Sequence, residues 1–261
     1  MSEASIKDLF ENISRPSAKY DSYFDAYDTL FSKFRNKDIT FVEIGILGGG
    51  SLEVWKNYFG PGSRIIGIDL NPQLKEDLKK DGFDVYIGDQ GDPKFWEQFY
   101  KEVGKVDILL DDGGHTNEQQ LTTLQCGLPH IKNGGMIVIE DVHASYMPKF
   151  GNPGKHSFIE NAKRIIDIIN SRSARLDEKL FRDDWSYSKY VYNVQFFESI
   201  AAFHIDTTLC RKSTLQQFGD KSVLPNQEIP EDLRHKQDLE RRESISIWNS
   251  MFRKLSALIK K

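Results

Sequence analysis

Hydrophobic and polar positions follow two alternating patterns along the middle of the chain. Short, almost continuous apolar runs are separated by stretches in which apolar residues recur every three or four positions. The continuous runs are typical of strands buried on both faces of a parallel sheet, and the wider spacing is typical of helices with one buried face. The expected strands cover residues 39–45, 64–70, 83–89, 106–112 and 135–141. The expected helices between them cover residues 51–59, 73–80, 93–103 and 117–131.

This repeated order of strand and helix predicts an α/β fold: a doubly wound, mostly parallel, seven-stranded sheet with helices on both faces. The last two strands are expected in VYNVQFFESIAAFHI, residues 191–205, with a turn around Glu198 and Ser199. We expect this pair to close the sheet in the antiparallel sense. A further helix is expected over 158–170.

The segments outside the sheet predict helical additions. Amphipathic spacing over 5–13 and 22–34 makes residues 1–38 an N-terminal helical cap. Residues 39–206 are the expected catalytic domain. We expect residues 207–261 to form a helical extension, packed on this domain or on a subunit partner in a homo-oligomer.

Composition narrows the class of protein. With 261 residues, 39% hydrophobic and 28% charged, the chain suits one large domain with decorations. A net charge of −4 gives no general attraction to nucleic acid. No apolar stretch approaches the ~20 residues of a membrane span, and the acidic N-terminus does not resemble a signal peptide. Two distant cysteines, Cys126 and Cys210, argue against a disulfide framework or a thiolate metal site, so we expect a cytoplasmic protein.

A glycine-rich turn follows the first expected strand, in VEIGILGGGS (42–51). Glycine lets the backbone turn sharply and approach a ligand closely, and the helix that follows offers unpaired N–H groups. The spacing departs from the dinucleotide fingerprint GxGxxG, and the acid Glu43 is better placed for a cationic ligand than for a pyrophosphate. The candidate binding residues are Glu43, Gly45, Gly48, Gly49 and Ser51. The alternative is a tight strand-to-helix connection that needs glycine only for packing.

Acidic residues also end the second and third expected strands. Asp69 is placed to accept the hydroxyls of a ribose, as the corresponding acid does in nucleoside-binding α/β folds. Asp89 and Gln90 are placed near an adenine edge, although Asp89 is equally suited to cap the next helix.

Two further strands end in acids, in LLDDGGHT (109–116) and IVIEDVH (137–143). Neighbouring strands lie about 4.8 Å apart, so side chains just past both ends can meet. Asp112, Glu140 and Asp141 offer hard oxygen ligands, which favour magnesium, calcium or manganese over zinc. Glu140 and Asp141 would point to opposite faces of a regular strand, so both reach one ion only if the chain is already leaving the strand. His115 is placed to take a proton from a metal-bound hydroxyl.

Each of these residues also has a structural interpretation. Asp111 and Asp112 could cap the helix that begins near His115, and Glu140 with Asp141 could be an ordinary polar strand exit. We expect Asp111 to act as this cap or to contact a cofactor from the strand end. His143 is expected either to line an acceptor pocket or to fill a loop, and Tyr146 is a candidate for stacking on a sugar.

Together these segments resemble the class I S-adenosylmethionine-dependent methyltransferases, and more narrowly the metal-dependent macrolide sugar O-methyltransferases and their cephalosporin-biosynthesis relatives. The resemblance covers residues 41–146 and implies a Rossmann-like methyltransferase fold. It implies that the glycine turn with Glu43 holds the methionine part of S-adenosylmethionine, Asp69 the ribose, and Asp89 with Gln90 the adenine. It also implies the roles at the acidic strand ends: Asp112, Glu140 and Asp141 bind Mg²⁺, and His115 is the general base.

The expected function is therefore Mg²⁺-dependent methylation of a hydroxyl on a sugar, a glycosylated natural product or a polysaccharide. One alternative is a metal-dependent oxygenase on the same fold, for which His115 and His143 would supply the two histidines of an iron triad. The other is a nucleoside-binding protein without catalysis. A pure binder has no need of a base beside a metal, which speaks against the second alternative.

Overall fold

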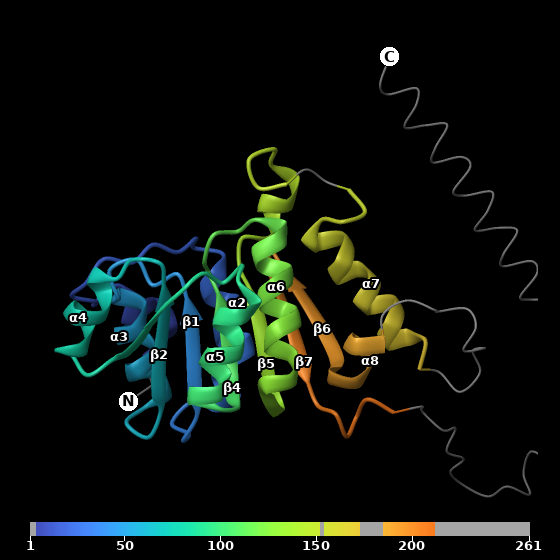
Figure 1. The fold of residues 1–261 in the computed structure, drawn as a ribbon. Coiled ribbons are helices and arrows are strands. Elements are labelled where there is room, and N and C mark those ends of the chain that lie inside the picture. Colours follow the sequence, from blue (N-terminus) through green and yellow to red (C-terminus); the bar gives the residue numbers. More distant parts are fainter. Residues whose placement is uncertain (1–3, 152–153, 173–184, 212–261) are drawn as a thin grey trace, which may run out of the picture. The chain divides into compact units, whose positions relative to one another are not determined.

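A computed structural model describes residues 4–151, 154–172 and 185–211, and within them seven strands form one sheet (Figure 1). The sheet order is β3-β2-β1-β4-β5-β7-β6. Strands β1 to β5 are parallel, whereas β7 runs antiparallel to both β5 and β6. The strands are β1 (Thr40–Ile44), β2 (Arg64–Asp69), β3 (Asp84–Ile87), β4 (Val106–Asp111), β5 (Ile131–Ile139), β6 (Val191–Phe197) and β7 (Ile200–Ile205). The predicted fold, including the antiparallel closing pair, is confirmed.

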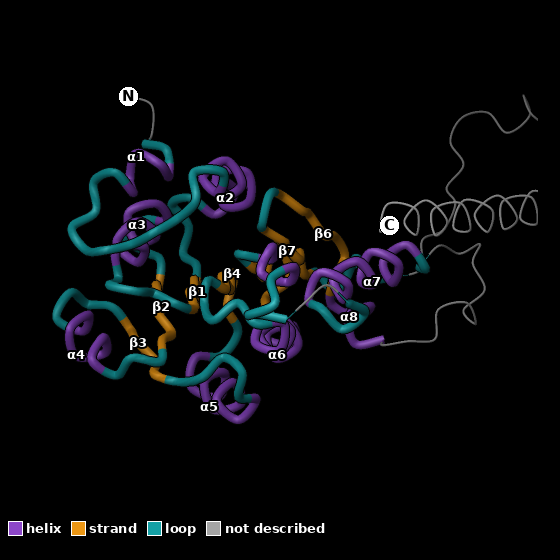
Figure 2. Tube along the Cα trace, turned by 90° about the horizontal axis from the view of Figure 1, so that it is seen from above, coloured by secondary structure: helices purple, strands orange, loops and turns teal. Residues whose placement is uncertain are grey.

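Helices cover both faces of this sheet. Seen from above, α2 and α3 lie on one side of the strands, and α5 and α6 lie on the other (Figure 2). The α-helices are α1 (Ile6–Phe10), α2 (Tyr23–Phe31), α3 (Gly50–Phe59), α4 (Gln73–Lys79), α5 (Pro93–Val103), α6 (Asn117–Gly127), α7 (Phe158–Asn170) and α8 (Trp185–Tyr190). Short 3-10 turns are η1 (Ser32–Phe34), η2 (Leu128–His130) and η3 (Val142–Tyr146).

The sheet separates two hydrophobic cores, because successive residues of a strand point to opposite faces. Phe41 of β1 packs into the core that contains α1 to α4, and its neighbour Val42 packs into the core beneath α5 to α7. The N-terminal helices share the first core: Tyr27 and Phe31 of α2 meet the edge of the Trp55 ring at 5.3 and 5.6 Å between centroids. This packing fixes the segment that leads into α2 against the sheet.

One predicted boundary is wrong. The helix expected over 117–131 ends as an α-helix at Gly127, and β5 begins at Ile131 instead of 135. Pro129 lies just beyond this end, and because proline has no N–H donor it cannot continue the hydrogen-bond ladder of the helix. Leu128–His130 accordingly form a single 3-10 turn.

Among the described residues, no helix has both the length and the apolar character needed to cross a membrane. The C-terminal extension expected over 207–261 lies outside the described residues from 212 onward.

The burial of His204 on β7 is expected to make the folded state less stable in acid. Its side chain is buried, Nε2 has no hydrogen-bond partner, and burial with a smaller effect of Lys33 lowers its pKa to about 4. The unfolded chain therefore binds a proton between pH 6.5 and 4 that the folded chain rejects, so stability is lost as pH falls through this window. We expect His204→Gln to lose less melting temperature than the wild type between pH 7 and 4 in calorimetry. If both proteins lost melting temperature equally, His204 would not contribute to the acid sensitivity.

Candidate active site

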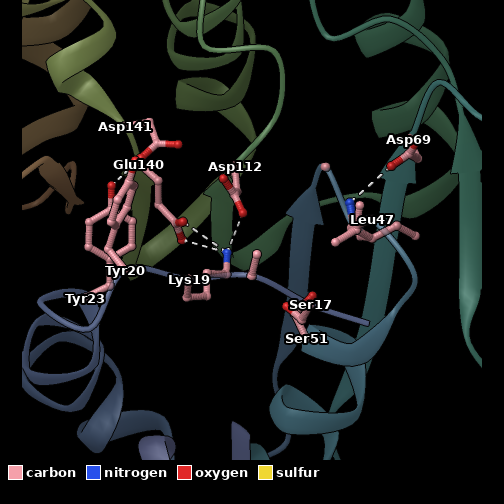
Figure 3. Close-up of a pocket in the computed structure, with 13 residues that line it drawn as sticks. Ser17, Lys19, Tyr20, Tyr23, Leu47, Ser51, Asp69, Asp112, Glu140 and Asp141 are labelled. Atoms are coloured by element: carbon pink, nitrogen blue, oxygen red, sulfur yellow. Dashed lines mark hydrogen bonds and ion pairs between the residues drawn. The ribbon is translucent and has the colours of Figure 1, made fainter. Parts of the chain in front are cut away.

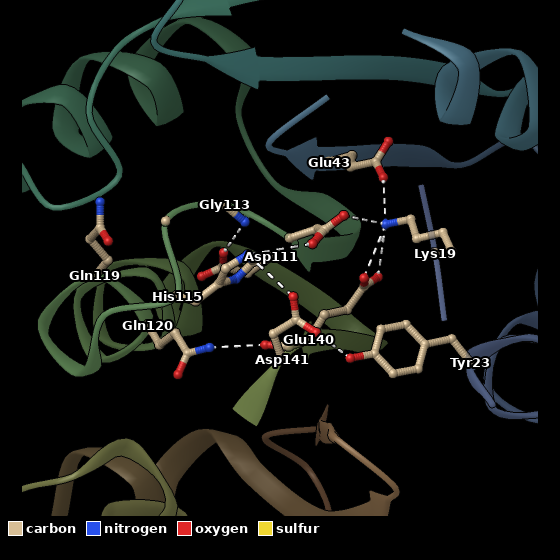
Figure 4. Close-up of polar contacts among 12 residues, drawn as sticks. Lys19, Tyr23, Glu43, Asp111, Gly113, His115, Gln119, Gln120, Glu140 and Asp141 are labelled. Atoms are coloured by element: carbon tan, nitrogen blue, oxygen red, sulfur yellow. Dashed lines mark hydrogen bonds and ion pairs between the residues drawn. The ribbon is translucent and has the colours of Figure 1, made fainter. Parts of the chain in front are cut away.

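The predicted acidic residues gather at the carboxyl ends of three adjacent strands (Figure 4). Ile44 of β1 pairs with Asp111 of β4, and Asp111 pairs with Ile139 of β5. The residues that follow these strand ends therefore lie side by side. The backbone N–H of Glu140 donates to the carbonyl of Asp111 at 2.9 Å, which extends the alignment beyond the sheet.

The chain leaves the strand at the Glu140–Asp141 pair, as a shared site requires. Strand β5 ends at Ile139, and Asp141 has a left-handed conformation with φ 54° and ψ 33°. Both side chains line the same cavity. Their contacts differ, however: Asp141 faces His115 and Glu140 faces Lys19.

Two aspartates and a histidine form the group best arranged for a cation. One ligating atom each from Asp112, His115 and Asp141 lies within 4.8 Å of the others. Nε2 of His115 is 3.2 Å from Oδ2 of Asp141 and 4.0 Å from Oδ1 of Asp112. Nδ1 of His115 is buried without a hydrogen-bond partner. The structure thus brings the expected base next to two of the three expected metal ligands.

Glu140, the third expected ligand, is engaged elsewhere. It is fully buried, accepts a 2.6 Å hydrogen bond from the Tyr27 hydroxyl, and lies 3.0 Å from Nζ of Lys19. Burial, reinforced by the nearby Asp112 charge and opposed by Lys19, raises its pKa well above the usual value. Asp141 is hydrogen-bonded to a different tyrosine, because the Tyr23 hydroxyl donates to its Oδ1.

Lys19 is the main residue that the sequence did not reveal. Its side chain is only 2% exposed, and it contacts Glu43, Asp112 and Glu140. Burial favours the neutral amine, but the surrounding negative charges, led by Glu140, outweigh it and raise the pKa of Lys19. Its position between two short helices carries no periodic signal. Tyr23 and Tyr27 were also missed. Their spacing of four residues places both hydroxyls on one face of a helix, which could have indicated that they contact the same polar site.

The glycines of the turn are closely packed, and one of them also lines the larger cavity. Gly45 has φ +79°, and an added Cβ would lie 2.1 Å from the Asp112 carbonyl oxygen, so only glycine fits beside the acidic strand end. Gly45 also lines the cavity. Gly48 instead packs on Pro16, where a Cβ would lie 2.8 Å from the proline ring, and Gly49 is the N-cap residue of helix α3, with φ +90°. Neither of these last two lines a described cavity.

Glu43 lies beneath this turn as a buried anion. Its Oε2 accepts hydrogen bonds from Ser51 Oγ at 2.6 Å and from Trp55 Nε1 at 3.1 Å. Burial raises its pKa, and Lys19 and Ser51 oppose that shift.

Two cavities lie at this edge of the sheet, and Figure 3 shows the residues that line the larger one. The larger, about 540 Å³, is lined by Ser17, Ala18, Lys19, Tyr20, Tyr23, Gly45, Ile46, Leu47, Ser51, Asp69, Asp112, Glu140 and Asp141. The smaller, about 220 Å³, is lined by Ile44, Gly45, Asp69, Leu70, Gly88, Asp89, Gln90, Gly113, Gly114 and Gln119. Both have Gly45 and Asp69 among their lining residues, so the cavity beside the acidic cluster adjoins the one beside the end of β3.

Asp69 lies where the two cavities join. One of its oxygens accepts from the Ile46 N–H at 3.2 Å and the other from the Asn71 N–H at 2.9 Å. Each carboxylate oxygen keeps further acceptor capacity toward the cavity.

The capping roles considered for Asp89, Asp111 and Asp112 are wrong. The residues that cap α5 and α6 are Asp92 and Thr116, the latter in a capping box with Gln119. The Asp89 carboxylate accepts from the Gly91 N–H within its own turn. Asp111 is buried and accepts from Gln90 Nε2 at 2.9 Å, so it supports the wall of the smaller cavity without lining it.

Neither of the two residues expected at an acceptor pocket lines these cavities. His143 has a part-exposed side chain with Nδ1 3.9 Å from Asp141, and its ring meets Tyr20 at 5.8 Å between centroids. Tyr20 lines the larger cavity, but His143 does not. Tyr146 is 53% exposed on η3 and lines neither cavity.

Comparisons with known proteins agree on one family. Residues 42–142 match a family model described as a methyltransferase domain. Demethylmacrocin O-methyltransferase of Streptomyces fradiae is 32% identical over 67% of this chain and 46% of its own length. Mycinamicin VI 2''-O-methyltransferase of Micromonospora griseorubida is 36% identical over 48% of this chain and 32% of its own length. The chain thus spans less than half the length of these curated relatives.

A solved structure shares the fold. The MycE methyltransferase from the mycinamycin biosynthetic pathway, in complex with Mg and SAH, superposes with a TM-score of 0.70 at 26% identity. The match covers 78% of this chain and 55% of that one.

Proposed function

The chain carries a methyltransferase domain similar to those of the sugar O-methyltransferases, and from this premise we propose its activity. We propose that it transfers a methyl group from S-adenosylmethionine to a hydroxyl of a sugar or glycosylated small molecule, assisted by a divalent ion. The observation that carries the proposal is the grouping of Asp112, His115 and Asp141 beside a cavity that continues to Gly45 and Asp69.

The cofactor is proposed to lie along the two joined cavities. Its methionine end lies by Gly45 and Ser51, where the buried charge of Glu43 suits a cationic amino group. Asp69 accepts the ribose hydroxyls at the junction. The adenine enters the smaller cavity beside Asp89 and Gln90, with Asp111 holding Gln90 in place.

The acidic cluster fits a hard divalent cation such as Mg²⁺. Its proposed ligands are carboxylate oxygens, with no thiolate, and the imidazole of His115 lies beside them with Nδ1 left without a partner. Asp112, Glu140 and Asp141 are the residues proposed to hold the ion. When bound, such an ion lowers the free energy needed to deprotonate an alcohol.

The other residues place and deprotonate the acceptor. His115 takes the hydroxyl proton at Nε2, and the adjacent Asp112 and Asp141 carboxylates stabilise the resulting imidazolium. Tyr23 holds Asp141 in position for this role. Aligning the oxygen with the methyl group of an already activated sulfonium donor supplies most of the acceleration, an effect worth up to about 7 to 11 kcal/mol.

One observation favours an oxygenase as a second candidate. Asp141 lies between His115 and His143, at 3.2 and 3.9 Å, which is the composition of a two-histidine, one-carboxylate iron site. A requirement for dioxygen and Fe(II) would favour this candidate. Full turnover without oxygen would exclude it.

Asp69→Ala tests the cofactor site. Losing hydrogen bonds to a charged group costs about 1.5 to 3 kcal/mol, so we expect binding of S-adenosylhomocysteine to weaken by about 10- to 100-fold in calorimetry. Asp84→Asn is the matched control, because Asp84 begins β3 at the opposite end of the sheet and pairs with Arg64. Equal affinity in the wild type and Asp69→Ala would place the cofactor elsewhere.

We further propose a cytoplasmic enzyme with a small-molecule acceptor and without a nucleic-acid partner. Cys126 and Cys210 are both free thiols, which suits a reducing compartment. Three of the relatives are named for O-methylation of mycinamicin VI, of a rhamnosyl tetracenomycin-C and of L-olivosyl-oleandolide, and the net charge of −4 disfavours phosphate backbones.

A further inference from the structure

The ammonium group of Lys19 fills a cation position built by three strand ends (Figure 4). Its Nζ lies 2.7 Å from Asp112, 3.0 Å from Glu140 and 3.2 Å from Glu43. A lysine ammonium has three N–H donors, and each finds a carboxylate here. The carboxylates come from the ends of β4, β5 and β1, whereas Lys19 comes from the segment that precedes α2. The protein therefore binds its own cation at the acidic edge of the sheet.

This position adjoins the group formed by Asp112, His115 and Asp141. Asp112 belongs to both: its Oδ2 faces Lys19 and its Oδ1 faces His115. Both oxygens of Glu140 lie within 3.2 Å of Nζ. A divalent ion bound by Glu140 would need an oxygen that Lys19 holds, even if it used the free Oδ1 of Asp112. Two cations at such short range in a buried site repel each other, which favours displacement of the ammonium.

We propose that Lys19 is an internal cation that gives way to the divalent ion. It holds Asp112 and Glu140 in place while the site is free of metal, and its ammonium moves into the larger cavity when the ion binds. This inference rests on the metal requirement in the proposed function. The cavity can receive the group, since Lys19 and its neighbours Ala18 and Tyr20 already line it.

The exchange also links the metal to the cofactor. When Lys19 leaves, the buried Glu43 loses its ion-pair partner and becomes free to attract the cationic amino group of the cofactor. Coupling between two ligands is reciprocal. Mg²⁺ is therefore expected to tighten binding of S-adenosylhomocysteine in the wild type and to do so less in a Lys19→Met variant.

Residue-resolved amine modification tests the movement directly in the full chain. Lys19 is expected to react slowly without metal and about tenfold faster with saturating Mn²⁺. Without metal, the carboxylates hold its ammonium group in about 90% of molecules, and the ion releases it to react. Lys132 serves as the internal control: it is exposed, pairs with Asp107 away from this site, and should react equally in both states.

Lys19→Met provides a second readout. This variant keeps an unbranched side chain but has no charge. Without the competing ammonium group, Mn²⁺ should bind about tenfold more tightly, as measured by electron paramagnetic resonance. The modification experiment needs no variant and stands even where Lys19→Met fails to fold.

Two results would overturn the inference, and they differ. If Mn²⁺ binds while Lys19 stays protected, the ion lies with Asp112, His115 and Asp141, and Lys19 is a permanent counter-ion of Glu140. If the wild type binds no Mn²⁺, the metal requirement of the proposed function fails as well.

Discussion

Replacing His115 with alanine is expected to reduce methyl transfer by about 10²- to 10⁴-fold, the usual contribution of a positioned general base. The alcohol would then have to lose its proton without an acceptor at Nε2. Binding of S-adenosylhomocysteine should be unchanged, because His115 lines neither of the cavities proposed to hold the cofactor. Single-turnover rates with radiolabelled S-adenosylmethionine, paired with calorimetry, separate the two effects.

His130→Ala is the matched control for this experiment. His130 stacks on Tyr100, with ring centroids 4.1 Å apart, beneath the opposite end of β5 from the acidic cluster. It should leave turnover unchanged. Normal turnover in His115→Ala would show that another group removes the proton.

Asp112→Asn is expected to abolish metal binding and with it turnover. Asp112 contacts His115 on one side and Lys19 on the other, so it takes part in either position open to a cation. Removing a residue that only supports a metal ligand costs about 10- to 100-fold in metal affinity, and loss of a direct ligand should exceed about 100-fold. Mn²⁺ titration followed by electron paramagnetic resonance measures this change.

Asp107→Asn controls for the loss of a negative charge on the same strand. Asp107 lies at the other end of β4 and pairs with Lys132, so metal affinity should be unaffected. In the wild type, EDTA should remove activity and added Mg²⁺ should restore it. Undiminished turnover after exhaustive chelation would contradict the metal requirement.

The sheet could be predicted because its strands carry a strong and local signal. Runs such as residues 106–112 and 135–141 are apolar on both faces, which only a strand covered by helices tolerates. The clustering of Asp112, His115, Glu140 and Asp141 followed from the same signal, since parallel strands end at one edge. The left-handed backbone at Asp141 then allowed both acids of the pair to face one cavity.

What the sequence concealed depends on long-range contacts or on a misjudged local signal. Lys19 meets Glu140 across 121 positions of chain, and nothing near Lys19 specifies that partner. The cap of α6 could have been predicted from the sequence, because Thr116 and Gln119 have the spacing of a capping box. The prediction considered Asp111 and Asp112 for the cap instead. Asp111 consequently looked available for a cap or a ligand, while in the fold it holds Gln90.

The most direct test of the central claim is a crystal structure with S-adenosylhomocysteine and Mn²⁺, read by anomalous scattering. The account predicts one manganese peak in contact with oxygens of Asp112, Glu140 and Asp141. It also predicts the cofactor product in the joined cavities, with its ribose on Asp69. A crystal with the product bound there but no manganese at Asp112, or with the product bound elsewhere, would contradict it.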